Sequence, residues 1–488
     1  MKAESIKLDS EKNTQDEKLE SCSVDSLPIV QSDAEKKLVK KINYTFMPFV
    51  CVLLFIQYID KSTISMISVI PEFYTDTGLT KDKYTWLGSF FYVGFLCMQL
   101  PNNYLLQKVQ VSKYAGICLV LWGVVLLCMA FGKNFGQLAG LRFLLGFFEA
   151  ITYPTIFLLI STIYRRSEQV IWLGVMFISN SVAGVLGGFI GVGIMKMPIV
   201  GIITPWKWAF IIFGSITIAI GISYFFFLPD RPDSRWFRLT EEEKLIVQER
   251  TRDNAVVATQ KINFSHFWEA VKEPRFYCYS LISVFINLQN GAFTIFSNII
   301  ITELGFSNTN AILLNIPTNV TIIILILIST NISKSKGEII YVAMVCCFIS
   351  MVGLICLTAI PSGGVKLIGI YLQSGGTPTY VLLQASITSN VSGYTKKIFY
   401  IGANLICYTV GNFVGPLLLR QKDSPRYYPA MGVYVAANVL VIILFGYVRY
   451  TYICANKKRN NLDKNAIALT GEIKDLTDVE NPNFVYKP

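Results

Sequence analysis

Charged residues are scarce in this sequence: Asp, Glu, Lys and Arg make up 15% of the 488 residues, whereas soluble globular proteins carry about 25%. Histidine occurs once, which excludes a proton relay built from histidines. We expect that residue, His266 beside Phe264 and Trp268, to lie on the surface of a polar helix. The sequence contains no Walker loop, nucleophile elbow, zinc-ligand spacing or disulfide framework. These absences argue against an enzyme, an ATP-driven pump, a metal site and a cofactor.

Apolar residues dominate instead, at 53% of the chain with a mean hydropathy of +0.48. Mainly apolar runs of about 18 to 25 residues recur, and each is long enough to cross a hydrocarbon core of about 30 Å. The predicted spans lie roughly at 45–67, 85–107, 112–131, 136–163, 169–195, 205–228, 276–302, 310–332, 338–360, 364–388, 397–419 and 431–453. We therefore predict an all-α, multi-pass membrane protein with twelve transmembrane helices in the lipid bilayer.

A long polar connection divides these spans six and six. It contains Thr240-Glu241-Glu242-Glu243, which has the form of a capping box that opens a helix. The start of the chain is rich in Ser, Glu, Asp and Lys without an apolar period, which is typical of disorder. We predict a disordered cytoplasmic tail over 1–40, an N-terminal six-helix bundle over 41–228, a cytoplasmic linker over 229–275, a C-terminal six-helix bundle over 276–453 and a cytoplasmic tail over 454–488.

The positive residues flank the apolar runs, although the formal net charge of +11 by itself would also suit a nucleic-acid-binding protein. Lys and Arg are concentrated in one set of alternate loops, which includes both ends of the chain and the 229–275 connection. By the positive-inside rule this set faces the cytoplasm. We thus expect both termini to be cytoplasmic and expect no nucleic-acid partner.

Four ionisable side chains inside the predicted spans are the candidate functional residues, because a charge in hydrocarbon is kept only where it faces a cavity or a partner. Asp60 and Lys61 lie in the first span, and Arg142 and Glu149 lie in the fourth. Seven residues are close to two helical turns, so Arg142 and Glu149 share a face about 10 Å apart along the axis. A solute carboxylate would bind Lys61 or Arg142, whereas Asp60 or Glu149 could gain and lose a proton.

Two other interpretations of these charges remain open. The four side chains could neutralise one another and hold the first and fourth spans together, or Asp60 and Lys61 could be solvated near the outer surface. Three asparagines inside spans, Asn287, Asn290 and Asn404, could donate hydrogen bonds either to a bound solute or to neighbouring helices.

Five stretches between residue 57 and about residue 430 carry a resemblance to a known family, in the order that the family has them. They are Tyr84–Gly94 with Pro101–Lys108, Leu141–Ala150 with Pro154, Leu228–Pro232 with Leu239–Lys244 and Glu249-Arg250, Gly305-Phe306 with Ala311–Pro317, and Asn390–Lys397 with Gly411-Asn412 and Gly415-Pro416. Together they resemble the major facilitator superfamily, and within it the fungal allantoate permease branch of the anion:cation symporter family.

The resemblance implies a two-bundle major facilitator fold and an alternating-access symporter that imports a small organic anion, driven by the proton gradient. Substrates across the branch include allantoate, ureidosuccinate, nicotinate, pantothenate, biotin and sulfur-containing acids. Bacterial sugar-acid symporters of the wider family have an acidic-basic pair in helix one and an Arg and a Glu seven apart in helix four. Asp60, Lys61, Arg142 and Glu149 match that pattern. By this analogy the acids carry protons and the bases bind the substrate carboxylate.

The sequence departs from the family at two places. The loop after the second span reads Asn103-Tyr-Leu-Leu-Gln107-Lys108, where a Gly-x-x-x-Asp-Arg gating motif is usual. Lys61 stands where many relatives have arginine, which replaces bidentate carboxylate binding by a point charge. We predict a monomer at the plasma membrane. A transporter-like nutrient sensor and an organellar anion exchanger are the alternatives.

Overall fold

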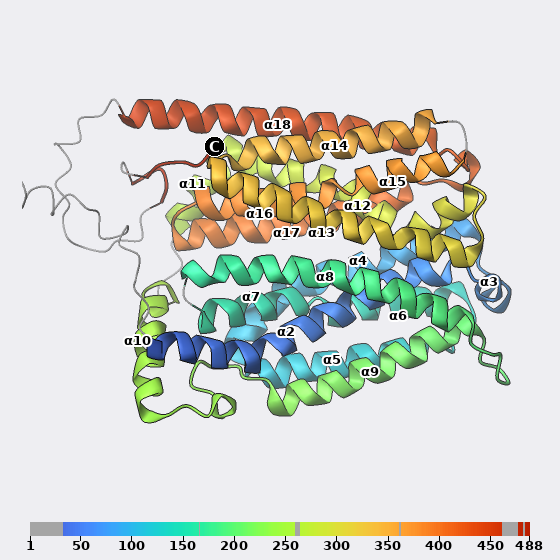
Figure 1. The fold of residues 1–488 in the computed structure, drawn as a ribbon, viewed down its shortest axis with the longest axis horizontal. Helices are drawn as coiled ribbons and strands as arrows, with labels where there is room; N and C mark the ends of the chain where they lie inside the picture. The colour runs from blue at the N-terminus through green and yellow to red at the C-terminus, as the bar shows by residue number, and fades with distance from the viewer. Residues whose placement is uncertain (1–32, 165, 259–263, 361–362, 461–476, 482–483) are drawn as a thin grey trace, which may run out of the picture.

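The computed structural model describes residues 33–164, 166–258, 264–360, 363–460, 477–481 and 484–488. Its helices form two groups that lie side by side, one built from the first half of the chain and the other from the second (Figure 1). Within the described residues there is no strand, apart from the isolated bridge between Val200 and Ile203. The predicted all-α fold with two helical bundles is therefore confirmed.

The first helix of the N-terminal bundle, α2, is much longer than its apolar run. The bundle contains α2 (Asp33–Ile67), α3 (Pro71–Thr77), α4 (Lys81–Lys108), α5 (Val111–Met129), α6 (Phe135–Glu149), α7 (Thr152–Ile163), α8 (Arg166–Met195) and α9 (Pro205–Phe227). Side-chain caps fix two of these starts, since Thr80 accepts a hydrogen bond from the Lys83 N–H and Asn134 accepts one from the Gln137 N–H.

The C-terminal bundle follows two linker helices, α10 (Glu241–Ala258) and α11 (Phe264–Lys272). It contains α12 (Pro274–Glu303), α13 (Asn308–Lys336), α14 (Ile339–Ala359), α15 (Leu367–Gln373), α16 (Gly376–Asn390), α17 (Tyr394–Leu417) and α18 (Tyr428–Asn460). The linker helices lie at one end of the molecule, which we call the α10 end. The opposite end, which carries α3, is the α3 end (Figure 1).

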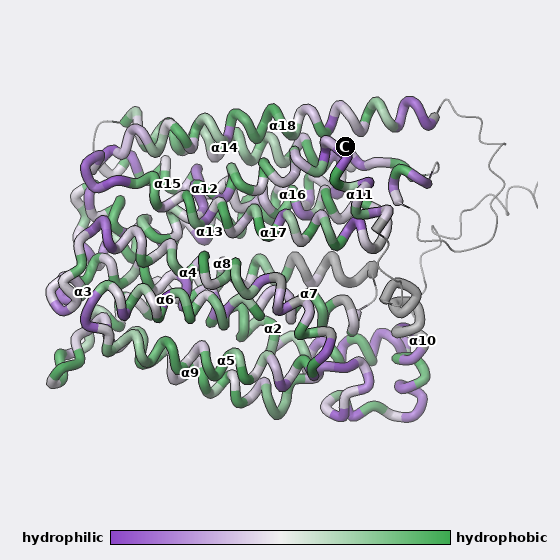
Figure 2. The backbone as a smooth tube through the Cα atoms, turned by 180° about the vertical axis from the view of Figure 1, so that it is seen from behind, coloured by the Kyte–Doolittle hydropathy of each residue, from purple (hydrophilic) through white to green (hydrophobic). Residues whose placement is uncertain are grey.

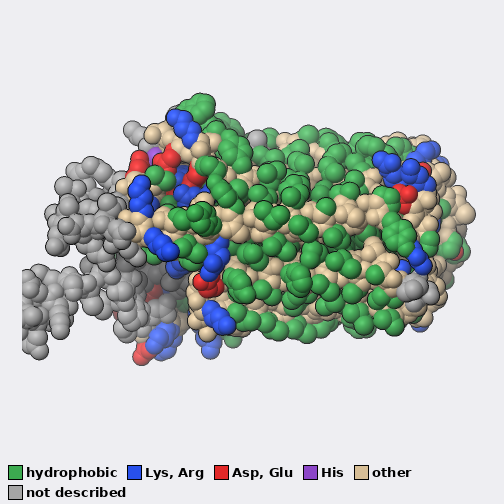
Figure 3. Space-filling model, turned by 90° about the horizontal axis from the view of Figure 1, so that it is seen from above, with side chains coloured by type: hydrophobic (Ala, Val, Ile, Leu, Met, Phe, Trp, Pro, Cys, Tyr) green, Lys and Arg blue, Asp and Glu red, His purple; other side chains and the backbone are tan. Residues whose placement is uncertain are grey.

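An apolar belt surrounds the middle of the molecule. Ten helical spans among the described residues are long and apolar enough to cross a membrane. Green, apolar side chains cover the middle of the visible face in Figure 3, and Lys and Arg gather toward its two ends. In Figure 2 the hydrophilic colour is likewise strong in α10 and in the turns at the α3 end. This distribution is that of a multi-pass membrane protein.

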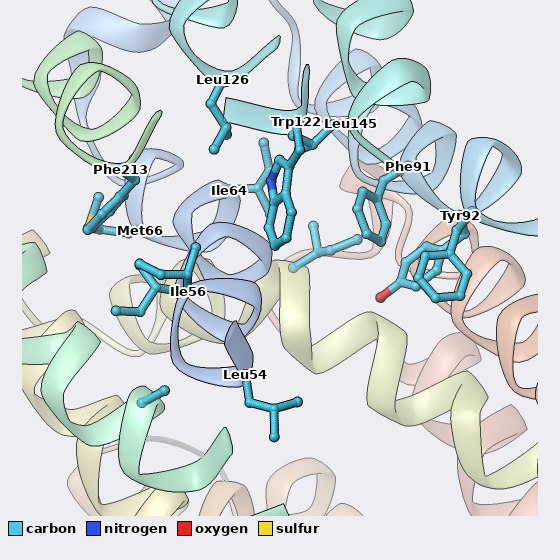
Figure 4. Packing of buried hydrophobic residues seen from close by; sticks show 14 of the residues in the cluster. Leu54, Ile56, Ile64, Met66, Phe91, Tyr92, Trp122, Leu126, Leu145 and Phe213 are labelled. Carbon is cyan, nitrogen blue, oxygen red and sulfur yellow. The ribbon is translucent and has the colours of Figure 1, made fainter. Parts of the chain in front are cut away.

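The interior of the N-terminal bundle is close-packed around Trp122 of α5, which is fully buried. Figure 4 shows this indole between Ile64 of α2 and Leu145 of α6, with Phe91 of α4 beside it. Glycines allow the helices to approach closely: a Cβ atom at Gly94 would stand 1.9 Å from the backbone oxygen of Phe143. The same close approach is known for small residues in membrane helices generally.

Two predicted spans, the fourth and the tenth, are each broken into two helices. The fourth consists of α6 and α7, and the tenth consists of α15 and α16. Each break is followed by a proline near the start of the second helix, Pro154 in α7 and Pro378 in α16. A proline has no N–H for the carbonyl one turn earlier, which interrupts the helical hydrogen bonds. Each proline follows the last residue of the first segment, Glu149 or Gln373, by five positions.

The prediction that all of residues 1–40 form a disordered tail is wrong for residues 33–40, which begin α2, while residues 1–32 lie outside the described residues. The linker helix α10 holds this extension in place. Glu35 forms a buried ion pair of 2.7 Å with Arg250, and Lys41 forms a partly exposed ion pair of 2.8 Å with Glu243. The hydrogen bond from Lys41 lowers the pKa of the Glu243 carboxyl below its usual range. Sequence periodicity missed these turns because their partners lie about 200 residues away.

The last described residues, 477–481 and 484–488, fold back onto the C-terminal bundle at the α10 end, and we call them the C-terminal strap. Asp478 lies 2.7 Å from the ammonium of Lys396, which also contacts Glu269 and Glu273 at 2.8 and 3.0 Å. Tyr486 stacks on Tyr452 with ring centroids 4.7 Å apart. The backbone of Lys487 pairs with the side-chain amide of Asn390 through two hydrogen bonds.

The strap also accounts for a wrong prediction about the histidine. His266 was expected on the surface, but it is only 3% exposed, and its Nε2 lies 3.6 Å from Glu480. The polar composition of α11 suggested a solvated helix. The strap covers one side of it, which no local pattern could indicate.

Replacing Lys396 with methionine should destabilise the protein strongly, because it removes the cation shared by Glu269, Glu273 and Asp478 and, among the described residues, leaves only Glu273 with a second one, Arg275. Removing one partner of a buried ion pair typically costs about 3–5 kcal/mol. We expect the apparent melting temperature in detergent to fall by several degrees. The matched control is Lys457→Met, since Lys457 is exposed on α18. Equal melting temperatures for the two variants would contradict a stabilising role for the cluster around Lys396.

Candidate functional site

The two bundles contact each other mainly through three pairs of helices: α2 with α12, α4 with α17 and α8 with α13. Several of the hydrogen bonds and ion pairs between the bundles lie toward the α3 end. There the Tyr84 hydroxyl donates to the carbonyl of Ile295 at 2.9 Å, and Ser65 and Ser297 share a hydrogen bond of 3.3 Å. An ion pair of 3.4 Å between Lys81 and Glu303 lies at the tip of the same helices.

A cavity lies between the bundles, with about 1030 Å³ of free space when the open solvent at its mouth is included. Its wall comes from α2, α8 and α9 on one side and from α12, α13, α15 and α16 on the other. The polar members of the wall are Tyr58, Ser62, Thr63, Ser65, Gln289, Asn290, Thr294, Ser297, Asn298, Asn315, Thr318, Asn319, Gln373, Ser374 and Thr377. Among the described residues that line it, none is charged. The cavity is thus polar but neutral.

Lys61 lies at the interface of the two bundles, on the same helix as six residues that line the cavity, although it is not itself among the lining residues. Its ammonium donates a hydrogen bond of 3.1 Å to the Tyr408 hydroxyl of α17, in the opposite bundle. It also lies 5.3 Å from the ring centre of Tyr92 and 5.6 Å from that of Tyr408, within cation–π range. Around the axis of α2, the position of Lys61 differs by about 60° from that of Tyr58 and by about 40° from that of Ser65. Tyr58 and Ser65 both line the cavity.

The other three predicted charges form a buried cluster behind Lys61, inside the N-terminal bundle. Asp60 and Glu149 are 0% exposed and Arg142 is 1% exposed. Surface solvation therefore does not describe Asp60. Gln57 donates a hydrogen bond of 2.8 Å to Glu149 Oε1, and Thr217 donates one of 3.5 Å to Asp60 Oδ2.

Direct ion pairs do not hold this cluster together. In the described part of the chain, no Arg142 nitrogen lies within 4.0 Å of a carboxylate oxygen of Asp60 or Glu149. Arg142 Nε and Nη2, Asp60 Oδ1 and Glu149 Oε2 have no hydrogen-bond partner there. The charges still interact electrostatically at longer range. The cluster is therefore buried and incompletely paired, a costly arrangement for a purely structural element.

The three predicted asparagines have different surroundings. Asn290 lines the cavity and donates a hydrogen bond of 2.9 Å to Asn412. Asn287 donates to the carbonyl of Ser283 and accepts from Asn412, and Asn404 accepts from Gln384, so both bond to protein groups here. Neither Asn287 nor Asn404 is among the described lining residues.

Sequence reasoning missed the tyrosines around Lys61 and most of the polar cavity wall. Tyr92 and Tyr408 were indistinguishable from other tyrosines in apolar runs, because their role depends on two helices meeting across the molecule. Asn315, Asn319 and Gln373 are polar residues within predicted spans. Their convergence on one cavity needed the three-dimensional fold.

The chain matches the model of the Major Facilitator Superfamily over residues 50–416. It is 31% identical to an uncharacterized transporter of Schizosaccharomyces pombe, over 94% of this chain and 93% of the relative. It is 30% identical to the allantoate permease of Saccharomyces cerevisiae, over 94% of this chain and 87% of the relative. The high affinity cysteine transporter of the same yeast is 26% identical, over 94% of this chain and 92% of the relative.

Two solved structures share the fold at low sequence identity. A bacterial homolog of the human lysosomal transporter Spinster, inward-facing and unoccupied, gives a TM-score of 0.64 at 14% identity, covering 83% of this chain and 96% of that one. The xylose transporter of E. coli, in a partially occluded inward open conformation, gives a TM-score of 0.60 at 12% identity. The match covers 83% of this chain and 98% of that one.

Proposed function

We propose that this chain, which belongs to the Major Facilitator Superfamily, imports a small organic anion together with protons. The family resemblance predicted from the sequence motifs is confirmed, and the relatives that match most of the chain are named as transporters and permeases. The chain is thus a multi-pass membrane transporter rather than an enzyme. The anion and the proton coupling are the parts that we propose.

The position of Lys61 is the observation that carries this proposal. A lysine ammonium lies at the interface of the bundles with a hydrogen bond to the opposite bundle, and its neighbours on α2 line a neutral polar cavity. A charge held in the membrane interior marks a substrate or ion pathway. A carboxylate solute in the cavity would take the place of Tyr408 as the partner of Lys61, with a charge-assisted hydrogen bond.

Proton coupling follows from counting the charges. Lys61 and Arg142 balance Asp60 and Glu149 when all four are ionised, so a bound monovalent anion leaves one uncompensated negative charge. Protonation of Glu149 or Asp60 would restore neutrality in the dry interior, where net charge is costly. We therefore propose one proton for each monovalent anion.

Arg142 would act differently from Lys61 in this scheme. It is 1% exposed inside the N-terminal bundle, whereas the Lys61 ammonium donates a hydrogen bond to the opposite bundle. We propose that it balances the charge of the two carboxylates in this conformation and reaches the solute carboxylate only after the bundles have moved. This modifies the role predicted from sequence, which placed the anion on both cations.

Transport would proceed by rocking of the bundles around the cavity. The contacts at the α3 end would have to separate for the cavity to open there. We place the α10 end, with both termini, in the cytoplasm, because Lys and Arg are concentrated in the loops of that side. We propose that the chain acts as a monomer in the plasma membrane.

A disulfide across the α3 end should stop transport. Ser65 and Ser297 belong to different bundles, and their hydroxyl oxygens are 3.3 Å apart. We expect the double variant Ser65→Cys with Ser297→Cys to lose uptake on oxidation and to recover it on reduction. Either single variant serves as the control. Full uptake by the oxidised double variant, with the cross-link verified by mass spectrometry, would contradict alternating access through this end.

Uptake by cells that express the chain tests the proposed function. A labelled panel of allantoate, nicotinate, pantothenate, biotin, cysteine and an alkyl sulfonate would be supplied at pH 5 and pH 7, with and without a protonophore. We expect one member to enter faster at pH 5, and the protonophore to abolish its accumulation. Absence of uptake of every member, in a protein shown to reach the surface, would contradict the proposal.

A further inference from the structure

The fourth and tenth spans have the same construction in their respective bundles. Each is broken, and each first segment ends five residues before the proline of the second segment. Glu149 ends α6 and Gln373 ends α15, so these two residues occupy corresponding positions. Their side chains have nearly the same length and shape. One can carry a charge and the other presents a neutral amide.

Gln373 faces the cavity between the bundles. It lines this cavity and is 7% exposed. Its side-chain amide makes no hydrogen bond to any described residue, whereas Glu149 receives one from Gln57. The amide therefore faces the cavity with its hydrogen-bonding groups open, and a bound solute that pairs with them is favoured.

Other amides around Gln373 leave acceptor oxygens open toward the same cavity. Asn315 uses its Nδ2 to donate to Ser297 and Asn298, and no described residue donates to its Oδ1. Asn290 likewise uses its Nδ2 on Asn412, and its Oδ1 has no described donor. Both residues line the cavity. An open carbonyl oxygen is satisfied by a solute N–H or O–H group.

We infer that the C-terminal bundle binds the uncharged part of the solute through Gln373, Asn290 and Asn315, which we call the amide pole. The transported anion would then carry a carboxylate at the Lys61 side and N–H or O–H donors, as in an amide, ureido or hydroxyl group, at the other. A carboxylate whose remainder is purely apolar would leave the amide pole unpaired and be rejected. This inference rests on the proposed function, because it concerns the same cavity.

Matched pairs of solutes test the inference. Each pair has one ureido acid and the alkanoate of the same heavy-atom shape: N-carbamoylglycine with 4-methylpentanoate, 3-ureidopropanoate with 5-methylhexanoate, and 4-ureidobutanoate with 6-methylheptanoate. Binding of each to the purified full-length protein would be measured by calorimetry. We expect the ureido member of at least one pair to bind about tenfold or more tightly than its alkanoate, because it makes more than one additional hydrogen bond.

Two variants separate the amide pole from the anion site. We expect Gln373→Leu to reduce the ureido-to-alkanoate preference by roughly threefold to tenfold, the effect of one neutral hydrogen bond, and Gln373→Asn to keep part of it. Lys61→Met should weaken both members of a pair alike and leave their ratio unchanged. Because the preference is a ratio within one protein sample, differences in folding and yield cancel.

The outcomes distinguish the inference from the function on which it rests. The ureido acid and the alkanoate of every pair could bind equally to the wild-type protein and fail to bind to Lys61→Met. That result would contradict the amide pole and leave the anion site intact. If Gln373→Leu weakens the binding of the ureido acid and of the alkanoate equally, Gln373 contributes to packing and does not select the solute. Absence of binding by all six solutes, together with absence of uptake of the labelled panel, would overturn both the inference and the proposed function.

Discussion

Replacement of Lys61 with methionine should reduce uptake of the anion by roughly 10- to 100-fold, the range expected when a charge-assisted hydrogen bond is removed. Methionine keeps an unbranched side chain of similar length, so the tyrosines around it can stay in place. Lys61→Arg keeps the charge and adds bidentate geometry, and it should retain much more uptake than the methionine variant. Initial rates of uptake over a range of concentrations would measure the effect.

The control for Lys61 is Lys457→Met, because Lys457 lies exposed on α18, a helix that does not line the cavity. It removes one positive charge from the protein without touching the site. If Lys61→Met transported the anion with unchanged kcat and KM while reaching the membrane normally, Lys61 would not bind the solute.

Replacement of Glu149 with glutamine should abolish accumulation against a gradient. Glutamine has the same shape and can still pair with Gln57, but it cannot release a proton. We expect the variant to equilibrate the anion across the membrane, so that the ratio of inside to outside concentration falls to about one. The difference between uptake at pH 5 and pH 7 should disappear with it.

Asp60→Asn and Asp230→Asn complete this experiment. Asp60 shares the buried cluster, so its variant shows whether the second carboxylate also carries the proton. Asp230 accepts a hydrogen bond from the Ser112 hydroxyl near the start of α5, outside the cavity, and serves as the control. Accumulation by Glu149→Gln that remains sensitive to a protonophore would assign the coupling to a residue other than Glu149.

The fold was largely predictable because the bilayer imposes strong constraints on length and polarity. Runs of 18 or more apolar residues can hardly be anything but spans, and a polar segment between two sets of six marks the linker. Charges within those runs were equally conspicuous, which is why Asp60, Arg142 and Glu149 were identified and do lie together. Pro154 and Pro378 were visible in the sequence, but their effect on two otherwise continuous runs was not predicted.

What failed to emerge from the sequence depends on contacts between distant segments. Lys61 meets Tyr408 across an interval of 347 residues, and the burial of His266 depends on the strap at the other end of the chain. Helical periodicity fixes which residues share a face of one helix. It does not fix which neighbour that face meets, so the cavity wall and the amide pole required the assembled bundles.

The most direct test of anion-proton symport is proton movement in proteoliposomes that contain the purified protein and a pH-sensitive dye in the lumen. The solute that cells accumulate would be added outside, with no pH gradient at the start. We predict acidification of the lumen that depends on the solute and is lost in Glu149→Gln, with about one proton entering for each monovalent anion. Entry of the labelled solute without any change in luminal pH would contradict proton symport.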